Sequence, residues 1–297
     1  MRGRVRMTLD QINIRDPYIL PYDGKYYMYG TRVRITEAYP TRWGEQHGFD
    51  VYISQDLKNW SEPKSVFEKN DSFWGEEEFW APEVHIYRGK FYMLATFKAE
   101  GRCMATHILV SDTPDGFFTP VSPDPITPAD WVSLDGTLYI DKKGKPHVVF
   151  CHEWKQIGNG TVCEIALSDD LTHAISAPRE LWSAKDYKAV RTVRQGQECY
   201  VTDGPFLYRC KNGDLICIWS SFNEQGYAEL ISKSDNADID GNWTVCDTPL
   251  TPETGGHGMI FRDFSGNAQF VMHRPNTKTL ERPTITPLLE DNGVLHT

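Results

Sequence analysis

The sequence predicts an all-β fold, a single five-bladed β-propeller domain over residues 1–297 with blades of about four antiparallel strands. Three observations predict it. Short runs rich in Val, Ile, Tyr, Phe and Trp alternate with clusters of Gly, Asp, Asn and Pro, which is the pattern of strands and turns. A hairpin-like segment recurs five times, and a strand ending in Ser-Asp or Ser-x-Asp follows each of the first four copies. Repeats of this kind, 50–70 residues apart, are typical of propellers.

Each repeated segment contains a polar residue, a strand, a turn with glycine and a second strand. The copies begin at Arg15, Ala81, Leu134, Thr202 and Gly256. Their turns read DGK, RGK, KKGK, KNGD and DFSGN, and short glycine turns between hydrophobic runs favour hairpins. The longer stretches 31–49 and 184–200 are predicted to be loops over one face of the ring.

Aligning the five segments places four carboxylates and a histidine at matching positions. These residues are Asp16, Glu83, Asp135, Asp203 and His257. The first strand of each propeller blade lines the central channel, so the five side chains are predicted to meet at one mouth of the ring. An Asp at the start of a strand is also a common turn residue. Four acids in one repeat phase, however, gather like charge that must be paired, bound to a metal or used in chemistry.

Composition limits the partners. The formal charge of −10 makes nucleic acid and anionic membranes poor partners, whereas an uncharged oligosaccharide substrate is compatible with it. The seven cysteines lack C-x-x-C spacing, and several lie in apolar runs, which predicts free thiols in a reducing compartment. Neither a signal peptide nor an 18-residue apolar run is visible, so a cytoplasmic location is expected. Nothing in the sequence indicates an oligomeric state.

Five motifs carry a resemblance to a known family. RDPYIL, WAPEVH, LDGTLYID, TDGPFLY and GHGMIF, in this order between about Arg15 and about Arg274, resemble the blade motifs of glycoside hydrolase family 43. Members of that family are five-bladed propellers that act on arabinose and xylose glycosides. The resemblance implies an inverting hydrolase in which Asp16 is the general base and Asp135 orients the acid and tunes its pKa.

The predicted acid departs from the family pattern. The family usually has Glu-Gly-Pro in the fourth blade, where this chain has Asp203-Gly204-Pro205. An Asp carboxyl lies one C–C bond, about 1.5 Å, further back. Asp203 is favoured as the acid, with Glu198 as the alternative. A carboxylate crowded beside the acid would raise its pKa, as an inverting mechanism near neutral pH requires.

Further residues are candidates for substrate contact. Trp80 and Trp154 could stack on a sugar face, although Trp80 could equally belong to the core. Glu83 either positions the ligand or forms a structural ion pair. Arg15 either sets the ionisation of Asp16 or contacts a hydroxyl. Arg274 or Arg282 could point into the site from the closing segment.

No cofactor is predicted to be required. His257 resembles the axial histidine that approaches a cation in many members of the family, and it is also a candidate for substrate contact. Any ion there would be a structural Ca²⁺ or similar cation, held mostly by water and other oxygen ligands. No spacing typical of catalytic zinc occurs.

The resulting prediction is an arabinofuranosidase-like or xylosidase-like enzyme that acts on oligosaccharides. One rival is a propeller hydrolase or phosphorylase for fructosides, galactosides or galactofuranosides. Glu198-Cys199 matches the acid motif of fructosidases, but their Asn-Asp-Pro motif is missing. The other rival is a non-catalytic carbohydrate-binding propeller, which the shortened acid at Asp203 keeps open.

Overall fold

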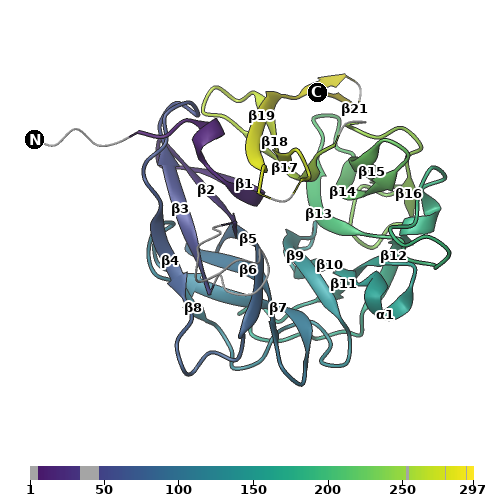
Figure 1. Cartoon of the computed structure of the whole chain (residues 1–297), viewed down its shortest axis with the longest axis horizontal. Coiled ribbons are helices and arrows are strands. Elements are labelled where there is room, and N and C mark those ends of the chain that lie inside the picture. Colours follow the sequence, from purple (N-terminus) through teal and green to yellow (C-terminus); the bar gives the residue numbers. More distant parts are fainter. Residues whose placement is uncertain (1–5, 34–46, 252–253, 278, 292) are drawn as a thin grey trace, which may run out of the picture.

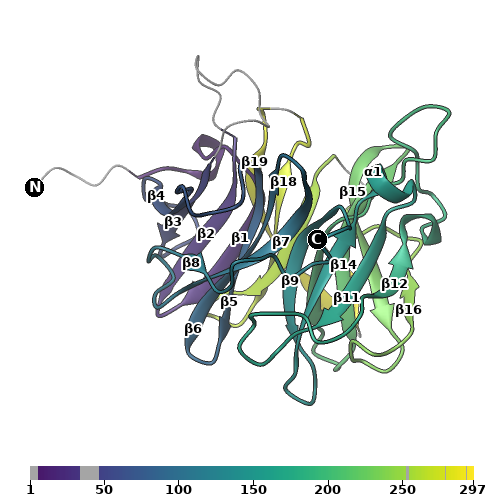
Figure 2. The ribbon, with the colours of Figure 1, turned by 90° about the horizontal axis from the view of Figure 1, so that it is seen from below.

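Antiparallel sheets surround a central axis in the computed structural model, as the repeats predict (Figure 1). The structure describes residues 6–33, 47–251, 254–277, 279–291 and 293–297. The first strand of each sheet lies nearest the axis, and the later strands follow outward. Seen from the side, the strands of neighbouring blades run alongside one another through the thickness of the ring (Figure 2).

Four blades contain four described strands each. Blade 1 comprises β1 (Ile14–Tyr22), β2 (Lys25–Arg32), β3 (Gly48–Ser54) and β4 (Lys64–Glu68). Blade 2 comprises β5 (Glu77–Tyr87), β6 (Lys90–Ala99), β7 (Arg102–Ser111) and β8 (Thr119–Pro120). Blade 3 comprises β9 (Ser133–Ile140), β10 (Pro146–His152), β11 (Thr161–Ala166) and β12 (Arg179–Ser183). Blade 4 comprises β13 (Asp203–Arg209), β14 (Leu215–Asn223), β15 (Gly226–Ser234) and β16 (Trp243–Val245).

The fifth blade differs from the prediction of about four strands. Its sheet has three described strands, β17 (Gly256–Arg262), β18 (Ala268–Arg274) and β19 (Arg282–Pro287). A separate hairpin follows it, β20 (Leu289–Asp291) with β21 (Val294–His296). The short helices are η1 (Leu9–Gln11), α1 (Trp154–Ile157) and η2 (Ala184–Asp186). No helix among the described ranges is both long and apolar enough to cross a membrane.

The predicted loops are only partly loops. Thr31 and Arg32 belong to β2, and Gly48 and Phe49 belong to β3, while residues 34–46 lie outside the described part of the chain. The stretch 184–200 contains the short helix η2 and no strand.

Aromatic rings fill the space between the first two blades. Phe67 lies 5.9 Å from Phe97 and 6.2 Å from Phe79 between ring centroids, and all three rings are almost fully buried. The first pair is edge-to-face and the second is stacked, and aromatic contacts of both kinds add to the free energy of burial. The high aromatic content of the sequence is therefore used in part as core.

Every inner strand contains the same irregularity. The register of its pairing with the second strand shifts across two residues: Asp16-Pro17, Ala81-Pro82, Asp135-Gly136, Gly204-Pro205 and His257-Gly258. The first residue of each pair has a left-handed backbone, with φ of 51°, 47°, 58°, 51° and 50° in this order. A bulge with a left-handed residue re-aims side chains, and for a residue other than glycine it costs about 1–3 kcal/mol.

The second residue of each pair suits the bulge for steric reasons. Proline has no N–H to leave unpaired. Where glycine stands instead, there is no room for a side chain: a Cβ at Gly136 would lie 2.5 Å from the Thr106 side chain, and one at Gly258 would lie 2.4 Å from Phe270. The repeated Pro or Gly therefore marks the bulge in the sequence.

Hydrogen bonds from these left-handed residues join neighbouring blades. The N–H of Ala81 donates to Thr31 Oγ1 (2.7 Å), and the N–H of Asp135 donates to Thr96 Oγ1 (2.9 Å). In each case the acceptor lies on the second strand of the preceding blade. The ring therefore carries the same polar contact from one blade to the next.

Two further contacts continue this series around the ring. The N–H of His257 donates to Ser220 Oγ (2.7 Å), and the N–H of Asp16 donates to His273 Nδ1 (3.3 Å). The second of these joins the last blade to the first.

The contact between blades 3 and 4 departs from this series. Cys151 occupies the acceptor position there, opposite Leu134. The N–H of Gly204 donates instead to Asp135 Oδ2 at 3.0 Å. A side-chain carboxylate from the inner strand thus replaces the hydroxyl or imidazole used elsewhere in the series.

Removing one of these acceptors should destabilise the ring. The substitution Thr96→Val keeps the shape of the side chain but leaves the buried N–H of Asp135 without its acceptor. We expect the free energy of unfolding to fall by about 1–3 kcal/mol, measured by equilibrium denaturation. Thr106→Val is the matched control, because the buried Thr106 Oγ1 has no hydrogen-bond partner in the described structure. Equal losses for the two variants would contradict this role of Thr96.

Candidate active site

A cavity of about 520 Å³ lies where the inner strands begin. Its wall brings together residues from all five blades and from the segments between them. They are Arg15, Asp16, Glu78, Trp80, Leu134, Asp135, Glu153, Trp154, Lys155, Val193, Val201, Asp203, Phe222 and His257. Three of the predicted carboxylates and the predicted histidine therefore do meet at one mouth of the ring.

Asp16 is held as an ionised carboxylate. Its Oδ2 accepts a hydrogen bond from Thr31 Oγ1 at 2.6 Å, and its Oδ1 lies 3.3 Å from His257 Nδ1 and 3.7 Å from Arg15 Nε. Burial alone would raise the pKa of Asp16. The charges of His257 and Arg15, together with the Thr31 hydroxyl, outweigh burial and hold the pKa of Asp16 below its usual value.

Asp135 and Asp203 have the opposite tendency. Burial raises the pKa of Asp135, and the negative charges of Asp203 and Asp16 raise it further, against the opposing effects of His257 and the N–H of Gly204. Burial also raises the pKa of Asp203, although His257 and the hydrogen bond from Tyr227 limit the rise. The cavity therefore holds one carboxylate that ionises readily and two carboxyls that keep protons to higher pH.

Asp203 has a defined orientation. The Tyr227 hydroxyl donates to Asp203 Oδ2 at 2.9 Å. Tyr227 is itself buried, and its ring stacks on the imidazole of His273 with 5.9 Å between centroids. This tyrosine, which the sequence motifs did not indicate, fixes one oxygen of the predicted acid.

The two histidines beside Asp16 have different charges. Burial lowers the pKa of His257, but the charges of Asp16, Asp135 and Asp203 outweigh burial and raise it above the usual value. His273 accepts the N–H of Asp16 through Nδ1, and burial, followed by the charge of Arg15, lowers its pKa to about 3. His257 therefore supplies positive charge to the site, while His273 remains neutral.

Arg15 links Asp16 to the closing segment of the chain. Its Nη1 donates to Asn276 Oδ1 at 2.9 Å and lies 3.3 Å from Glu281 Oε1, in the loop between β18 and β19. Both interpretations of Arg15 drawn from the sequence are compatible with this position, since Arg15 lowers the pKa of Asp16 and also lines the cavity.

Three predicted residues do not line the cavity. Glu83 forms an ion pair with His85, with 2.9 Å between Oε2 and Nε2, so the structural alternative describes it. Glu198 is largely exposed and pairs with Lys185. Arg282 donates to three backbone carbonyls, those of Asp10, Thr279 and Glu281, and thereby fastens the closing segment rather than contacting the cavity.

The alignment that matched the four acids was wrong in two places. The bulge aligns Ala81, not Glu83, with Asp16, and it aligns Gly204, not Asp203, with Asp16. Glu83 therefore lies two residues after the left-handed position, where its side chain leaves the cavity. Asp203 lies one residue before that position and still reaches the cavity wall.

Trp80 and Trp154 form part of the wall, as predicted. The ammonium group of Lys155 lies 5.9 Å from the ring centroid of Trp80 and 5.8 Å from that of Trp154. The guanidinium carbon of Arg194 lies 5.0 Å from the ring of Trp154. Trp80 also packs against the core of blades 3 and 4, so it has both of the roles considered for it.

The residues predicted from the sequence did not include two acidic wall residues, Glu78 and Glu153, or the lysine between the tryptophans, Lys155. A signal for Glu153 exists. His152 pairs with Ser133, so the end of β10 lies at the rim where β9 begins. Polar residues that follow a second strand are therefore candidates for the same cavity as those that precede a first strand.

A cation at the predicted axial position would have few protein ligands. In the part of the chain that the structure describes, no group of three or more His, Cys, Asp or Glu side chains is arranged to hold a metal ion. Nδ1 of His257 faces Asp16 and Asp135 at 3.3 Å and 3.7 Å. A cation here would depend mainly on water, as expected from the sequence, and it stays a prediction.

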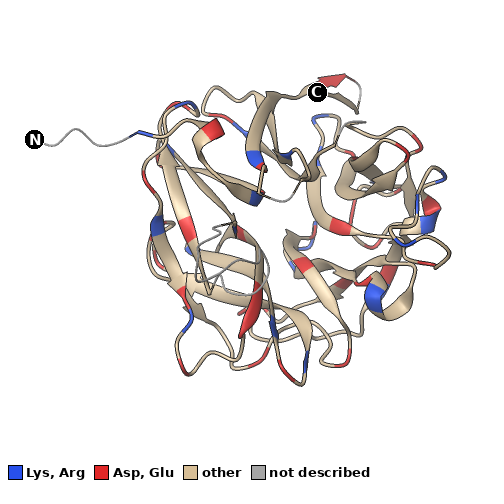
Figure 3. Ribbon diagram, viewed as in Figure 1, with Lys and Arg blue, Asp and Glu red and all other residues tan. Residues whose placement is uncertain are grey.

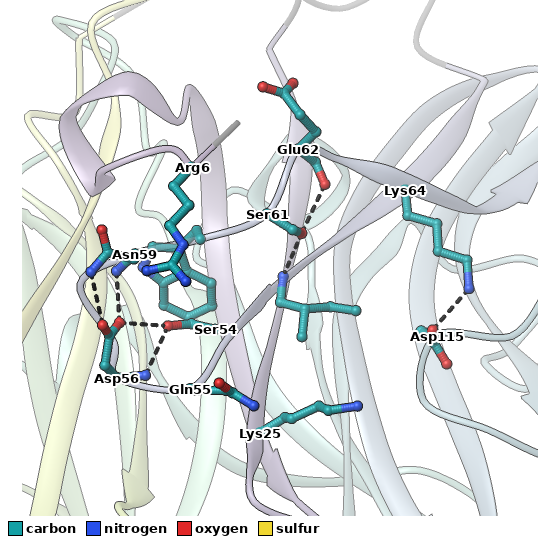
Figure 4. A pocket seen from close by; sticks show the side chains of 12 residues that line it. Arg6, Lys25, Ser54, Gln55, Asp56, Asn59, Ser61, Glu62, Lys64 and Asp115 are labelled. Atoms are coloured by element: carbon teal, nitrogen blue, oxygen red, sulfur yellow. Dashed lines mark hydrogen bonds and ion pairs between the residues drawn. The ribbon is translucent and has the colours of Figure 1, made fainter. Parts of the chain in front are cut away.

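A larger cavity, of about 660 Å³, lies beside blade 1 (Figure 4). Its charged and polar side chains largely satisfy one another. Lys64 Nζ lies 2.8 Å from Asp115 Oδ2, and Asp56 accepts hydrogen bonds from Ser54 and Asn59. None of the carboxylates that meet at the axis lines it. We therefore place the functional site in the smaller cavity.

Charge on the rest of the ring does not suggest a polyanionic partner. Lys and Arg are scattered around the blades rather than gathered in one sector (Figure 3).

Known proteins share this chain's sequence and fold. The sequence matches the family model for glycosyl hydrolases family 43 over residues 10–290. A solved endo-arabinase from Bacteroides thetaiotaomicron is 35% identical, with a TM-score of 0.88, over 97% of this chain and 98% of that one. A solved endo-1,4-beta-xylanase from the same organism is 27% identical, with a TM-score of 0.76, over 98% of this chain and 96% of that one.

Curated relatives match over a shorter length. Xylosidase/arabinosidase 43A of Humicola insolens is 26% identical over 152 residues, which cover 49% of this chain and 46% of that protein. The match thus spans about half of this chain and slightly less than half of the relative. Because the family model extends over nearly the whole sequence and the fold is the same propeller, the chain belongs to the glycosyl hydrolases of family 43, a family of glycosidases.

Proposed function

We propose that this chain is an inverting glycosidase that cleaves arabinofuranosyl or xylosyl units from oligosaccharides derived from arabinan or xylan. One observation supports the mechanism. A single cavity contains the ionised carboxylate of Asp16 and the carboxyl groups of Asp203 and Asp135, whose pKa values are raised. Inverting hydrolysis needs this pairing, a base ready to accept a proton and an acid that still carries one near neutral pH.

In the proposed reaction, Asp16 takes a proton from water as the water oxygen bonds to the anomeric carbon. The glycosidic bond breaks at the same time, and the proton of Asp203 passes to the leaving oxygen. The positive charge of His257 and Arg15 keeps Asp16 ionised before the step. Tyr227 holds one oxygen of Asp203, which limits the directions in which the acid can present its proton.

Asp135 has a supporting role in this proposal. Its Oδ2 accepts the N–H of Gly204, the residue that follows Asp203, so it fixes the backbone that carries the acid. Like charge between Asp135 and the neighbouring acids favours retention of protons on this side of the cavity. These contacts support the orienting and pKa-tuning role that the family resemblance implies.

The substrate class rests on the relatives. An endo-arabinase and an endo-1,4-beta-xylanase share the fold over nearly their whole length, and a curated relative is named a xylosidase/arabinosidase. The cavity also offers tryptophans that suit the C–H face of a sugar. Cytoplasmic action on imported oligosaccharides stays part of the proposal, supported by seven free cysteines.

Turnover of a panel of nitrophenyl arabinofuranosides, xylosides, galactosides and fructosides, with matching oligosaccharides, tests this function. We expect hydrolysis of arabinofuranosides or xylosides by the wild type, and a kcat about 10²–10⁴-fold lower for Asp16→Asn, since the base is lost. Asp112→Asn, a change at an exposed surface acid, is the control. Proton NMR of the first product should show the inverted anomer.

Three results would contradict parts of the proposal. Retained anomeric configuration would exclude water activation by Asp16. Full activity of Asp16→Asn would remove the base assignment. Binding of oligosaccharides without any turnover would favour the non-catalytic propeller.

Trp154 should contribute to substrate binding. We expect Trp154→Ala to raise KM about two- to tenfold with little change in kcat, because an aromatic stacking contact contributes about 0.5–1.5 kcal/mol. Steady-state kinetics on an oligosaccharide provide the measurement. Tyr22→Ala, at the opposite end of β1 from Asp16, is the control and should leave KM unchanged. An unchanged KM for Trp154→Ala would show that this ring is only part of the wall.

We propose that any cation at the axis is structural and that turnover needs no cofactor. Dialysis against a chelator should therefore leave kcat within about twofold, whereas added Ca²⁺ should raise Tm if the ion binds the folded state. Elemental analysis of the purified protein measures the ion directly. Loss of kcat on chelation, restored by Ca²⁺, would contradict the structural role.

A further inference from the structure

Glu153 is a buried acid in the cavity with a rigid backbone. It follows β10 and precedes α1, and its N–H donates to the carbonyl of Val132 at 2.8 Å. Its own carbonyl accepts the N–H groups of Gln156 (3.0 Å) and Ile157 (3.3 Å). Only 5% of its side chain is exposed, and it lines the same cavity as Asp203. The position of this carboxyl is therefore built into the fold.

The surroundings of Glu153 favour a protonated carboxyl. Oε1 lies 3.3 Å from Nζ of Lys155. Oε2 is buried and has no hydrogen-bond partner in the described structure. A buried carboxylate oxygen without a donor is costly, and retaining a proton removes most of that cost.

Asp203 is the acid whose charge acts most on Glu153. Burial raises the pKa of Glu153 to about 7, and the charge of Asp203 contributes next, against the ammonium group of Lys155. Repulsion between two carboxylates is mutual, so ionisation of either acid favours a proton on the other.

We propose that Glu153 holds the catalytic proton between turnovers and supplies it to the leaving oxygen through Asp203. This inference rests on the proposed function. It makes Glu153 a positioning residue that acts on the substrate only through the acid. It also explains how an aspartic acid can act at position 203, where the family usually has the longer glutamic acid. A neighbouring carboxyl holds the proton between turnovers.

Each proton that moves in this step has a defined donor and acceptor. The O–H bond of Glu153 breaks as its proton passes to a water in the cavity, and that water gives a proton to Asp203. The O–H bond of Asp203 breaks in turn as the leaving oxygen is protonated. Lys155 then stabilises the Glu153 carboxylate, which takes a proton from bulk water. Asp16 releases the proton gained from the attacking water to the same solvent.

The charged groups that face the pair come from several elements. Lys155 of α1 lies beside Glu153. Around Asp203 lie Arg15 and Asp16 of β1, Asp135 of β9, Tyr227 of β15 and His257 of β17. No ion pair or hydrogen bond of the described residues joins Glu153 to His257, so the proton store is separate from the base and its imidazole.

The pH dependence of kcat/KM for Glu153→Gln tests the proposal. Activity needs a proton on the pair, so the upper limb of the profile falls when that proton is lost. Without Glu153 only Asp203 can carry it, and the limb should move down by about one pH unit or more. Activity at the acidic end should return to within about threefold of the wild type, because Asp203 is then protonated by itself.

Two further variants test the same proposal, one with an opposite expected shift and one as a control. Lys155→Met removes the charge that lowers the pKa of Glu153, so the upper limb should move to higher pH, opposite to the effect of Glu153→Gln. Glu180→Gln, at an exposed position of the same blade, should leave the profile unchanged. Opposite shifts from neighbouring substitutions are not expected from a purely structural role.

Other outcomes overturn the inference. A loss of activity in Glu153→Gln that is equal at every pH would make Glu153 structural. A loss confined to substrates with poor leaving groups and not recovered in acid, with Asp203→Asn active on the same substrates, would make Glu153 the direct donor. That result would also displace Asp203 from the proposed mechanism.

A measurement independent of turnover keeps the inference testable if no glycoside is hydrolysed. In protein labelled with ¹³C at the Glu side-chain carboxyls, a resonance that titrates near pH 7 should be missing from Glu153→Gln. Burial also raises the pKa of Glu229 to about 7, and its resonance should remain in the variant. A Glu153 carboxyl that titrates in the ordinary range of about 4–5 would overturn the proposal. Absence of turnover with a normal Glu153 titration near 7 would instead count against the proposed function alone.

Discussion

Closure of the ring depends on a hydrogen-bond acceptor for the backbone N–H of one left-handed residue in each blade. Each of these residues stands at a bulge in an inner strand, where the sheet ladder cannot accept its N–H. Leaving a buried N–H unpaired costs about 1–3 kcal/mol, so each blade needs an acceptor from its neighbour. Thr31, Thr96, Ser220 and His273 supply it between four pairs of blades. Closure of the ring and the aim of the inner side chains are therefore one constraint.

The departure from this pattern explains where the chemistry is concentrated. Between blades 3 and 4 the acceptor is Asp135 itself, since Cys151 occupies the usual position. The carboxylate thus completes the ring and, in the same contact, lies beside the residue that follows Asp203. Room is tight there, because a Cβ at Gly204 would lie 2.7 Å from the His257 ring. A glycine after the predicted acid is consequently required by the close approach of the imidazole, and it also avoids the strain that the left-handed backbone causes at the matching residues of the other blades.

Much of this arrangement could be predicted from the sequence, and the errors have a common physical cause. The repeated hairpins predicted the blades, and Asp16, Asp135 and His257 do occupy matching backbone positions, which the structure shows to be the bulge. Glu83 and Asp203 were misaligned because the comparison followed the acidic residues, whereas the backbone follows the Pro or Gly after each left-handed residue. Glu153 and Tyr227 could not be found in that way. They lie at or beyond second and third strands, and only the packing of those strands brings them to the cavity or its acid.

The electrostatics of the cavity follow from which groups the blades can bring together. Blade 1 places Arg15 next to Asp16, and blade 5 adds His257, so positive charge gathers around one carboxylate and holds it ionised. On the side of blades 3 and 4 the acids Asp135, Asp203 and Glu153 are buried, and the charges of His257 and Lys155 offset that burial only in part. Burial and mutual repulsion favour the protonated form of these carboxyls. A base and an acid are thus separated across one cavity by the distribution of a few cations, without any difference in the intrinsic chemistry of the carboxyl groups.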